Sequence, residues 1–252
     1  MLSPHEGNEV AMPLPGARPA RSPRGRTAAE AVYAALRDDI VSLALKPGSQ
    51  VNEKAIALAH GVSRTPVREA ILRLAGEGLI DIVSKAGTYV SRIRLSALAE
   101  TIVVRKALEE VTVRAAVAHA TASQILGLRA ILARQAEAME AGDQAAFHLA
   151  DEAFHEAIAR AGGFPGIWTL VQNVKLQVDR YRRLTLPQPG RMALVIREHT
   201  AVLDAIEKRG AEAAAEAMGR HIAGLNLNLG EIHRINPDHF EEDVAAIERI
   251  VA

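Results

Sequence analysis

Hydrophobic and polar positions divide the chain into stretches of different period. Residues 1–26 hold five prolines and show no helical period, which predicts a disordered arm. Over residues 27–78 apolar side chains return every three or four positions, as they do on the buried face of an α-helix. In residues 79–90 the period falls towards two, which is typical of a β-hairpin. The helical period then resumes and continues over residues 95–235.

Three short helices are predicted ahead of the hairpin. The first ends in the Pro-Gly turn of LKPGS (45–49), and the second runs from Asn52, a favourable N-cap, to Gly61. A third begins near Pro66, a residue tolerated in the first turn of a helix. Three helices followed by a hairpin predict a winged helix-turn-helix over residues 27–94.

Six further helices are predicted beyond the hairpin, separated by glycine- and proline-containing breaks. No repeat of constant length is visible, so these helices indicate an antiparallel bundle over residues 95–236 rather than a solenoid. Residues 237–252 restart with Asn-Pro-Asp and predict a loose tail. The fold class is therefore mainly α, with an N-terminal winged helix and a C-terminal bundle. The predicted helices are about 96–120, 122–141, 143–162, 165–185, 190–209 and 211–235.

The charge is divided between the two predicted domains. Residues 1–94 carry 13 Lys and Arg against 9 Asp and Glu, whereas residues 95–252 carry 17 against 21. A basic front half and an acidic back half indicate two domains with different partners. The chain has no cysteine, which excludes disulfides and Cys-based metal sites. It also has no signal peptide or apolar run long enough for a membrane helix, so a cytoplasmic protein without a membrane partner is expected.

The third helix presents two arginines at its N-terminal end. At about 100° per residue, Arg64, Thr65 and Arg68 fall within one 100° arc, away from most of the apolar stripe of that helix. A recognition helix offers this end to base edges and phosphates in a major groove. Two arginines alone are also compatible with an ordinary solvated helix face.

The string that surrounds these arginines resembles a known DNA-binding domain. LKPGSQVNEKAIALAHGVSRTPVREAILRLAGEGLI, followed by KAGTYV, is similar to the winged helix of the GntR family of bacterial transcriptional regulators. The Pro-Gly turn, the GVSRTPVREA core and the glycine-containing wing appear in the same order. By this resemblance Arg64 and Arg68 read bases or phosphates. The other implied contacts are Ser63 and Thr65 with the DNA backbone, Lys54 with a phosphate, and the wing residues Lys85 and Gly87 in the minor groove.

The helical half contains a candidate metal centre. Asp151 and His155 are spaced i, i+4 and share one helix face, and His199 and His221 come from later helices. One carboxylate and three imidazoles inside a bundle can bind a divalent metal such as Zn²⁺, Ni²⁺ or Mn²⁺. From the spacing alone, such an Asp-x-x-x-His pair is more often part of a solvated helix face. His148 lies two turns from His155 on nearly the same face.

A second resemblance concerns this helical half. ETIVVRKALE (100–109), DEAFHEAI and two histidines 22 residues apart are similar to the FCD ligand-binding domain of the FadR subfamily. In that family such an Asp-His-His-His set binds metal, and an arginine on the first helix, here Arg105, holds the carboxylate of an organic acid. The alternative role for Arg105 is an i, i+4 salt bridge to Glu109. Six helices imply the shorter, VanR-like variant.

Together these patterns predict a ligand-responsive transcription factor and not an enzyme. A homodimer is expected to bind a palindromic DNA operator, most simply as a repressor, and to respond to a small carboxylate bound near the metal. Two alternatives use the same Asp and His residues: a metal-dependent hydrolase, in which the metal activates water, and a sensor of the metal itself.

Overall fold

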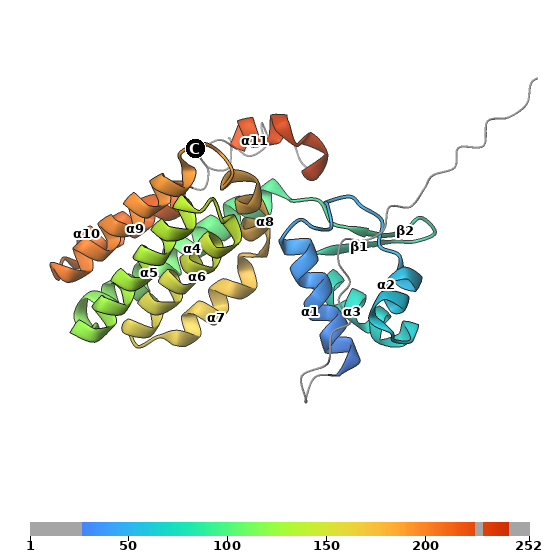
Figure 1. Ribbon diagram of the computed structural model, residues 1–252, viewed down its shortest axis with the longest axis horizontal. Helices are drawn as coiled ribbons and strands as arrows, with labels where there is room; N and C mark the ends of the chain where they lie inside the picture. Colours follow the sequence, from blue (N-terminus) through green and yellow to red (C-terminus); the bar gives the residue numbers. More distant parts are fainter. Residues whose placement is uncertain (1–26, 225–228, 242–252) are drawn as a thin grey trace, which may run out of the picture.

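The computed structural model describes residues 27–224 and 229–241. Two lobes are visible in Figure 1: a small one with three helices and a β-hairpin, and a larger one built of antiparallel helices. The mainly α fold class is confirmed. The predicted N-terminal arm and the end of the predicted tail lie outside the described residues.

The small lobe is a winged helix-turn-helix. Thr27 caps the first helix in a capping box with Glu30, and Asn52 accepts hydrogen bonds from two backbone amides at the start of the second. Ser63 occupies the N-cap position of the third helix but makes no capping hydrogen bond with its side chain. The elements are α1 (Ala28–Val41), α2 (Glu53–His60), α3 (Arg64–Gly76), β1 (Ile80–Val83) and β2 (Gly87–Val90).

The predicted apolar stripes form the core of this lobe. The apolar stripe of α3 packs against α1, and its four residues, Val67, Ala70, Ile71 and Leu74, are all buried. Strands β1 and β2 pair antiparallel, with Ile80 opposite Val90. Val51, ahead of α2, also bonds to the hairpin through the carbonyl of Thr88. The second strand of the wing is therefore hydrogen-bonded to the segment that precedes α2.

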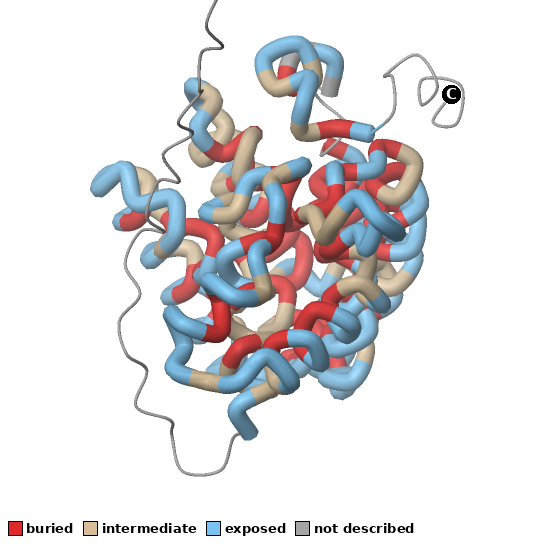
Figure 2. Tube along the Cα trace, turned by 90° about the vertical axis from the view of Figure 1, so that its right-hand side faces the viewer, coloured by how far each residue is buried: buried red, intermediate tan, exposed pale blue. Residues whose placement is uncertain are grey.

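The large lobe buries a second core between α4, α6, α9 and α10. Phe154, Ile158, Val202 and Met218 are fully buried there, and Figure 2 shows buried and exposed positions alternating along the helices. No helix among the described residues is long and apolar enough to cross a membrane. The helices are α4 (Leu95–His119), α5 (Ala122–Glu140), α6 (Gln144–Ala161), α7 (Pro165–Val174), α8 (Leu176–Thr185), α9 (Arg191–Glu207), α10 (Ala211–Ala223) and α11 (Leu229–Ile235).

One of the predicted long helices is wrong, because the helix expected over 165–185 is broken at Lys175 into α7 and α8. Of the helix expected over 211–235, the structure describes α10 and α11, and residues 225–228 lie outside the described part. The described chain between residues 95 and 235 thus holds more than the six predicted helices, and the VanR-like variant stays a prediction. Lys175 turns inward, and its ammonium lies 2.6 Å from carboxylate oxygens of Glu152 and Asp179. This ion cluster stabilises a helix break at a position where the sequence has no glycine or proline.

The segment after α11 is packed rather than loose. Pro237–His239 form one 3₁₀ turn, and Phe240, 5 % exposed, pairs with Ile93 in a parallel β-bridge. The Ile93 amide donates to the carbonyl of His239. For residues 237–241 the prediction of a loose tail is therefore wrong. This segment covers the connection between the two lobes.

Candidate metal centre and DNA-binding surface

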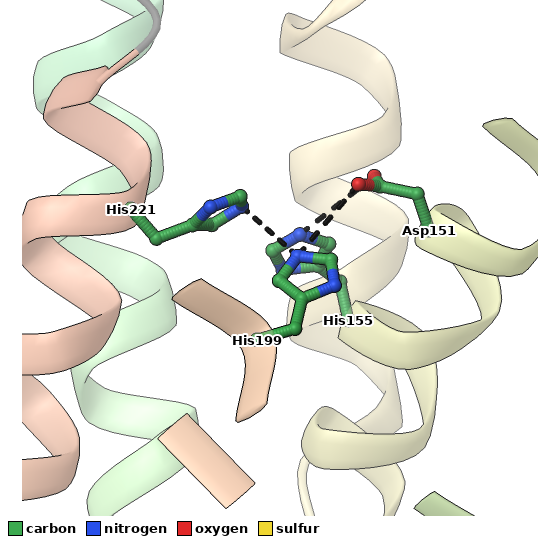
Figure 3. Close-up of side chains that lie close together, drawn as sticks. All are labelled: Asp151, His155, His199 and His221. Carbon is green, nitrogen blue, oxygen red and sulfur yellow. Dashed lines mark hydrogen bonds and ion pairs between the residues drawn. The ribbon is translucent and has the colours of Figure 1, made fainter. Parts of the chain in front are cut away.

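Three helices bring the four candidate metal ligands together inside the large lobe. Asp151 and His155 lie one turn apart on α6, His199 comes from α9 and His221 from α10 (Figure 3). None of the four is more than 3 % exposed. The helical spacing on α6 predicts one shared face, but the meeting with α9 and α10 depends on the packing of the bundle.

The side chains point at one another through atoms that can bind a metal. The Nε2 atoms of His199 and His221 are 3.1 Å apart. The Asp151 carboxylate lies 3.7 Å from Nε2 of His199 and 3.8 Å from Nε2 of His155. One ligand atom from each of the four residues lies within 4.8 Å of all the others. This is the separation expected for donors around one ion with bonds of about 2.0–2.2 Å.

The other ring nitrogen of each histidine faces an oxygen. Nδ1 of His155 lies 2.5 Å from Oε2 of Glu109, and Nδ1 of His199 lies 2.9 Å from Oε1 of Gln135. Nδ1 of His221 lies 2.9 Å from an oxygen of Glu198. An oxygen at Nδ1 favours a proton there, which leaves the lone pair of Nε2 directed towards the other ligands.

Electrostatics hold these groups in the states that bind metal. Burial lowers the pKa of both His199 and His221 well below the usual value, and their neighbouring imidazoles lower it further. Burial disfavours the Asp151 anion, but the charge and hydrogen bonds of Arg182 outweigh it and hold the pKa of Asp151 well below its usual value. Both guanidinium Nη atoms of Arg182 bond to that carboxylate. A carboxylate and two neutral imidazoles are therefore ready to bind metal at neutral pH.

Arg105 is buried beside this centre. Its Nε donates to Oε1 of Glu109 at 2.7 Å, so the i, i+4 salt bridge considered as an alternative does form. Its Nη2 is buried without a hydrogen-bond partner. Glu109 thereby joins Arg105 to His155, and one guanidinium donor stays available. Its predicted role as a ligand anchor stays a prediction.

His148 belongs to a different cluster. It lies with Glu152 and Asp179, and the ammonium of Lys175 occupies the space between the two carboxylates. Burial and, to a smaller extent, the charge of Arg182 lower the pKa of His148 to about 4. A buried cation already lies among the ligands of this cluster, so the Asp151 cluster fits a metal better.

The predicted DNA contacts lie on the surface of the small lobe. Arg64, Thr65 and Arg68 are exposed along the first two turns of α3, as are Lys54 on α2, Ser63 ahead of α3 and Lys85 in the wing. Arg64 pairs with Glu53 at 3.1 Å, with its side chain 72 % exposed. Gly87 has a φ of +132°, a value that residues with a side chain rarely adopt, and Lys85 has a φ of +63°. These two conformations shape the tight turn of the wing.

Comparisons with known proteins agree with both lobes. Residues 28–90 match the family described as bacterial regulatory proteins, gntR family, and residues 100–224 match the FCD domain. The chain belongs to the GntR family. It is 33 % identical to an HTH-type transcriptional regulator of Streptomyces ambofaciens over 88 % of this chain and 94 % of that protein. It is 31 % identical to the repressor RspR of Escherichia coli K12 over 84 % of this chain and 93 % of RspR.

Solved structures carry the same fold. McbR/YncC of E. coli superimposes with a TM-score of 0.68 at 22 % identity, covering 83 % of this chain and 99 % of that chain. A putative GntR regulator from Rhodococcus sp. RHA1 gives the same TM-score and identity, covering 81 % of this chain and 96 % of that chain. This GntR-family protein is therefore a DNA-binding transcriptional regulator and not an enzyme, as predicted, which removes the hydrolase alternative.

Proposed function

We propose that this GntR-family regulator is a repressor that binds a palindromic operator as a homodimer. Its affinity for DNA is set by a small organic acid bound beside a divalent metal in the FCD domain. Two relatives named as repressors support the sign: RspR and a probable D-xylose operon repressor of Paenarthrobacter nicotinovorans, which is 29 % identical over 70 % of this chain.

The observation that carries the proposal is the convergence of four metal-binding atoms in one buried place. Asp151, His155, His199 and His221 would hold the ion, and imidazole and carboxylate ligands suit Zn²⁺, Ni²⁺ or Mn²⁺. The metal would supply positive charge and free coordination positions to an acidic ligand. The surrounding residues fit such an ion, because each Nδ1 atom faces a protein oxygen and each Nε2 atom faces the other ligands.

Unpaired donors beside the centre support an organic acid as the effector. Nη2 of Arg105 and Nε1 of Trp168 are both buried without an acceptor. The Trp168 ring lies parallel to His155, with the ring centroids 5.9 Å apart. Buried donors without partners are costly, and a carboxylate could accept from Arg105 while binding the metal.

The DNA-reading half of the proposal uses the exposed surface of the small lobe. Arg64 and Arg68 would read base edges or phosphates from α3 in the major groove. The remaining contacts would be Ser63 and Thr65 with the DNA backbone, Lys54 with a phosphate, and Lys85 and Gly87 in the minor groove. The two copies of this surface in a homodimer would meet the two halves of a palindrome.

The metal is tested on purified protein by metal analysis and zinc titration. Wild-type protein should bind about one divalent ion per chain, and the double variant His199→Ala, His221→Ala should bind none. His148→Ala is the matched control, because His148 is an equally buried histidine of the same lobe that belongs to the other cluster. Unchanged metal content in the double variant would refute the assignment.

The effector is tested by a thermal-shift screen of small carboxylates with and without Zn²⁺. A ligand that binds only the folded protein raises its melting temperature, by an amount that grows with concentration. Carboxylates that stabilise the wild type only with zinc, and not the Arg105→Met variant, support the proposal. Stabilisation by zinc with no effect of any carboxylate favours the direct metal sensor instead.

A further inference from the structure

Helix α8 is a ten-residue helix held at one side by the metal centre. Figure 1 shows it between the bundle and the winged helix. The guanidinium of Arg182 on α8 donates hydrogen bonds to both carboxylate oxygens of Asp151. One residue along α6, Glu152 lies 2.6 Å from the ammonium of Lys175, the residue that precedes α8. Two ion pairs, one buried and one partly buried, therefore join α8 and the residue before it to the helix that carries two of the candidate metal ligands.

Another face of the same helix is fastened to the DNA-binding lobe. Arg180 lies two residues before Arg182, which places it on the opposite side of a helix. Arg180 is fully buried, and its guanidinium donates to the carbonyl of Ser91 and, at 3.3 Å, to the hydroxyl of Ser91. Gln177 donates to the carbonyl of Gly78 at 3.1 Å. Leu176 is buried in the hydrophobic core of the winged helix.

Gly78 and Ser91, which accept these bonds from α8, lie next to the two elements proposed to read DNA, α3 and the wing. Gly78 follows the end of α3 by two residues, and Ser91 directly follows β2 of the wing. Their own contact is close, because the hydroxyl of Ser91 donates to the carbonyl of Gly78 at 2.6 Å. A movement of α8 would therefore shift the recognition helix and the wing together.

We propose that α8 transmits the occupancy of the metal centre to the DNA-binding lobe, with Arg180 as the positioning residue at the receiving end. This inference rests on the proposed metal centre, and it adds that the bound ion alone, before an organic acid binds, changes the affinity for DNA. A cation bound to Asp151 shares the carboxylate with Arg182 and weakens their ion pair. Arg182 is only 3 % exposed, so its charge cannot turn freely into solvent, and the helix shifts instead. Packed helices move between discrete positions rather than deform continuously.

A second route competes with this one. Helix α4 follows directly from the winged helix and carries Arg105 and Glu109, so it could pass the signal through the chain itself. The two routes differ in their need for Arg180. A signal carried by α4 survives the loss of the Arg180 side chain, whereas a signal carried by α8 does not.

The test measures operator affinity with and without Zn²⁺ on full-length protein. The DNA is a duplex selected from a random-sequence pool by the wild type, and zinc alone is the probe. Zinc is expected to change the wild-type dissociation constant by roughly 5- to 150-fold, the usual range of coupling between two sites. In Arg180→Gln this ratio should fall towards one, while zinc affinity stays within about threefold of wild type, since metal ligands are untouched.

Three further variants make the result specific. Arg180→Lys keeps one donor for Ser91 and should restore part of the ratio. Arg160→Gln, which removes an exposed arginine of α6 paired with Glu156, should behave as wild type. If Arg180→Gln does not fold, Gln177→Leu takes its place. It removes the bonds of Gln177 to Gly78 and to Arg180 but leaves the bonds of Arg180 to Ser91, and it should lower the ratio in part.

Each remaining outcome decides the question. A wild-type ratio of one, with zinc and DNA both bound, overturns the inference while leaving the metal centre intact. A full ratio in Arg180→Gln overturns it in favour of α4. Wild-type protein that binds no zinc refutes the proposed metal centre itself, and the inference falls with it.

Discussion

Gln135 offers a sharp test of the proposed metal centre. Its side chain is fully buried on α5, and its amide oxygen lies 2.9 Å from Nδ1 of His199. We consider the Gln135→Leu substitution, which keeps the size of the side chain and removes the acceptor. Without this acceptor, the tautomer of His199 with its proton on Nδ1 is no longer favoured over the one with its proton on Nε2.

The expected change in stability is small because two effects oppose each other. The substitution leaves the Nδ1–H of His199 without an acceptor, which costs about 1–3 kcal/mol in a buried site. It also removes the amide nitrogen of Gln135, which is itself buried without a partner. The free energy of unfolding of the metal-free protein should therefore change by no more than about 1 kcal/mol.

The expected change in zinc affinity is larger. Losing the group that orients a metal-binding histidine typically weakens metal affinity by about 10- to 100-fold. At about 1.4 kcal/mol for each factor of ten, this is about 1.4–2.8 kcal/mol of binding free energy. Affinity and stability thus separate, which a general loss of packing would not produce.

The assay pairs a zinc competition titration with urea unfolding of the metal-free protein. Gln144→Leu is the matched control, because Gln144 is exposed at the start of α6 and its loss should alter neither quantity. A zinc affinity for Gln135→Leu within about twofold of wild type would refute the role of Gln135. An equal fall in stability and affinity would show that the amide serves packing alone.

Three further outcomes are expected. Arg68→Ala should weaken specific DNA binding by about 1–3 kcal/mol in a fluorescence anisotropy titration, with unchanged thermal stability; loss of folding instead would make this helix face structural. The depressed pKa values of His199 and His221 mean that the unfolded chain binds more protons below about pH 6.5. The free energy of unfolding of metal-free protein should thus fall from pH 7 to pH 5, by up to about 1.4 kcal/mol per pH unit for each histidine, and a flat profile in urea titrations would contradict this. Gly162→Ala should lower the free energy of unfolding by about 1–3 kcal/mol, because a Cβ would lie 2.8 Å from a backbone carbonyl of α4. Gly127 has open space around it, so Gly127→Ala should raise the free energy of unfolding by about 0.5–1 kcal/mol. If both substitutions changed the free energy of unfolding equally, the close contact of α6 with α4 would be contradicted.

The winged helix could be predicted closely because its signals are local. The Pro-Gly turn, the Asn52 cap and the stripe on α3 each act within a few residues, and each element forms where these signals indicate. The break at Lys175 was missed for the opposite reason. This break is stabilised by Glu152, 23 residues away in the chain, and the helical period of a sequence does not reflect contacts between such distant residues.

The sequence by itself determined the helical faces, the winged-helix motif and the residue types of the candidate metal centre. Only the tertiary structure brought the Nε2 atoms together, placed Glu109, Gln135 and Glu198 behind them, and paired Arg182 with Asp151. It also placed α8 between the candidate metal centre and the winged helix. The physical reason is that period and caps specify what one element does alone. Contacts between distant residues depend on how the helices pack, and packing is set by the shapes of all the buried side chains together.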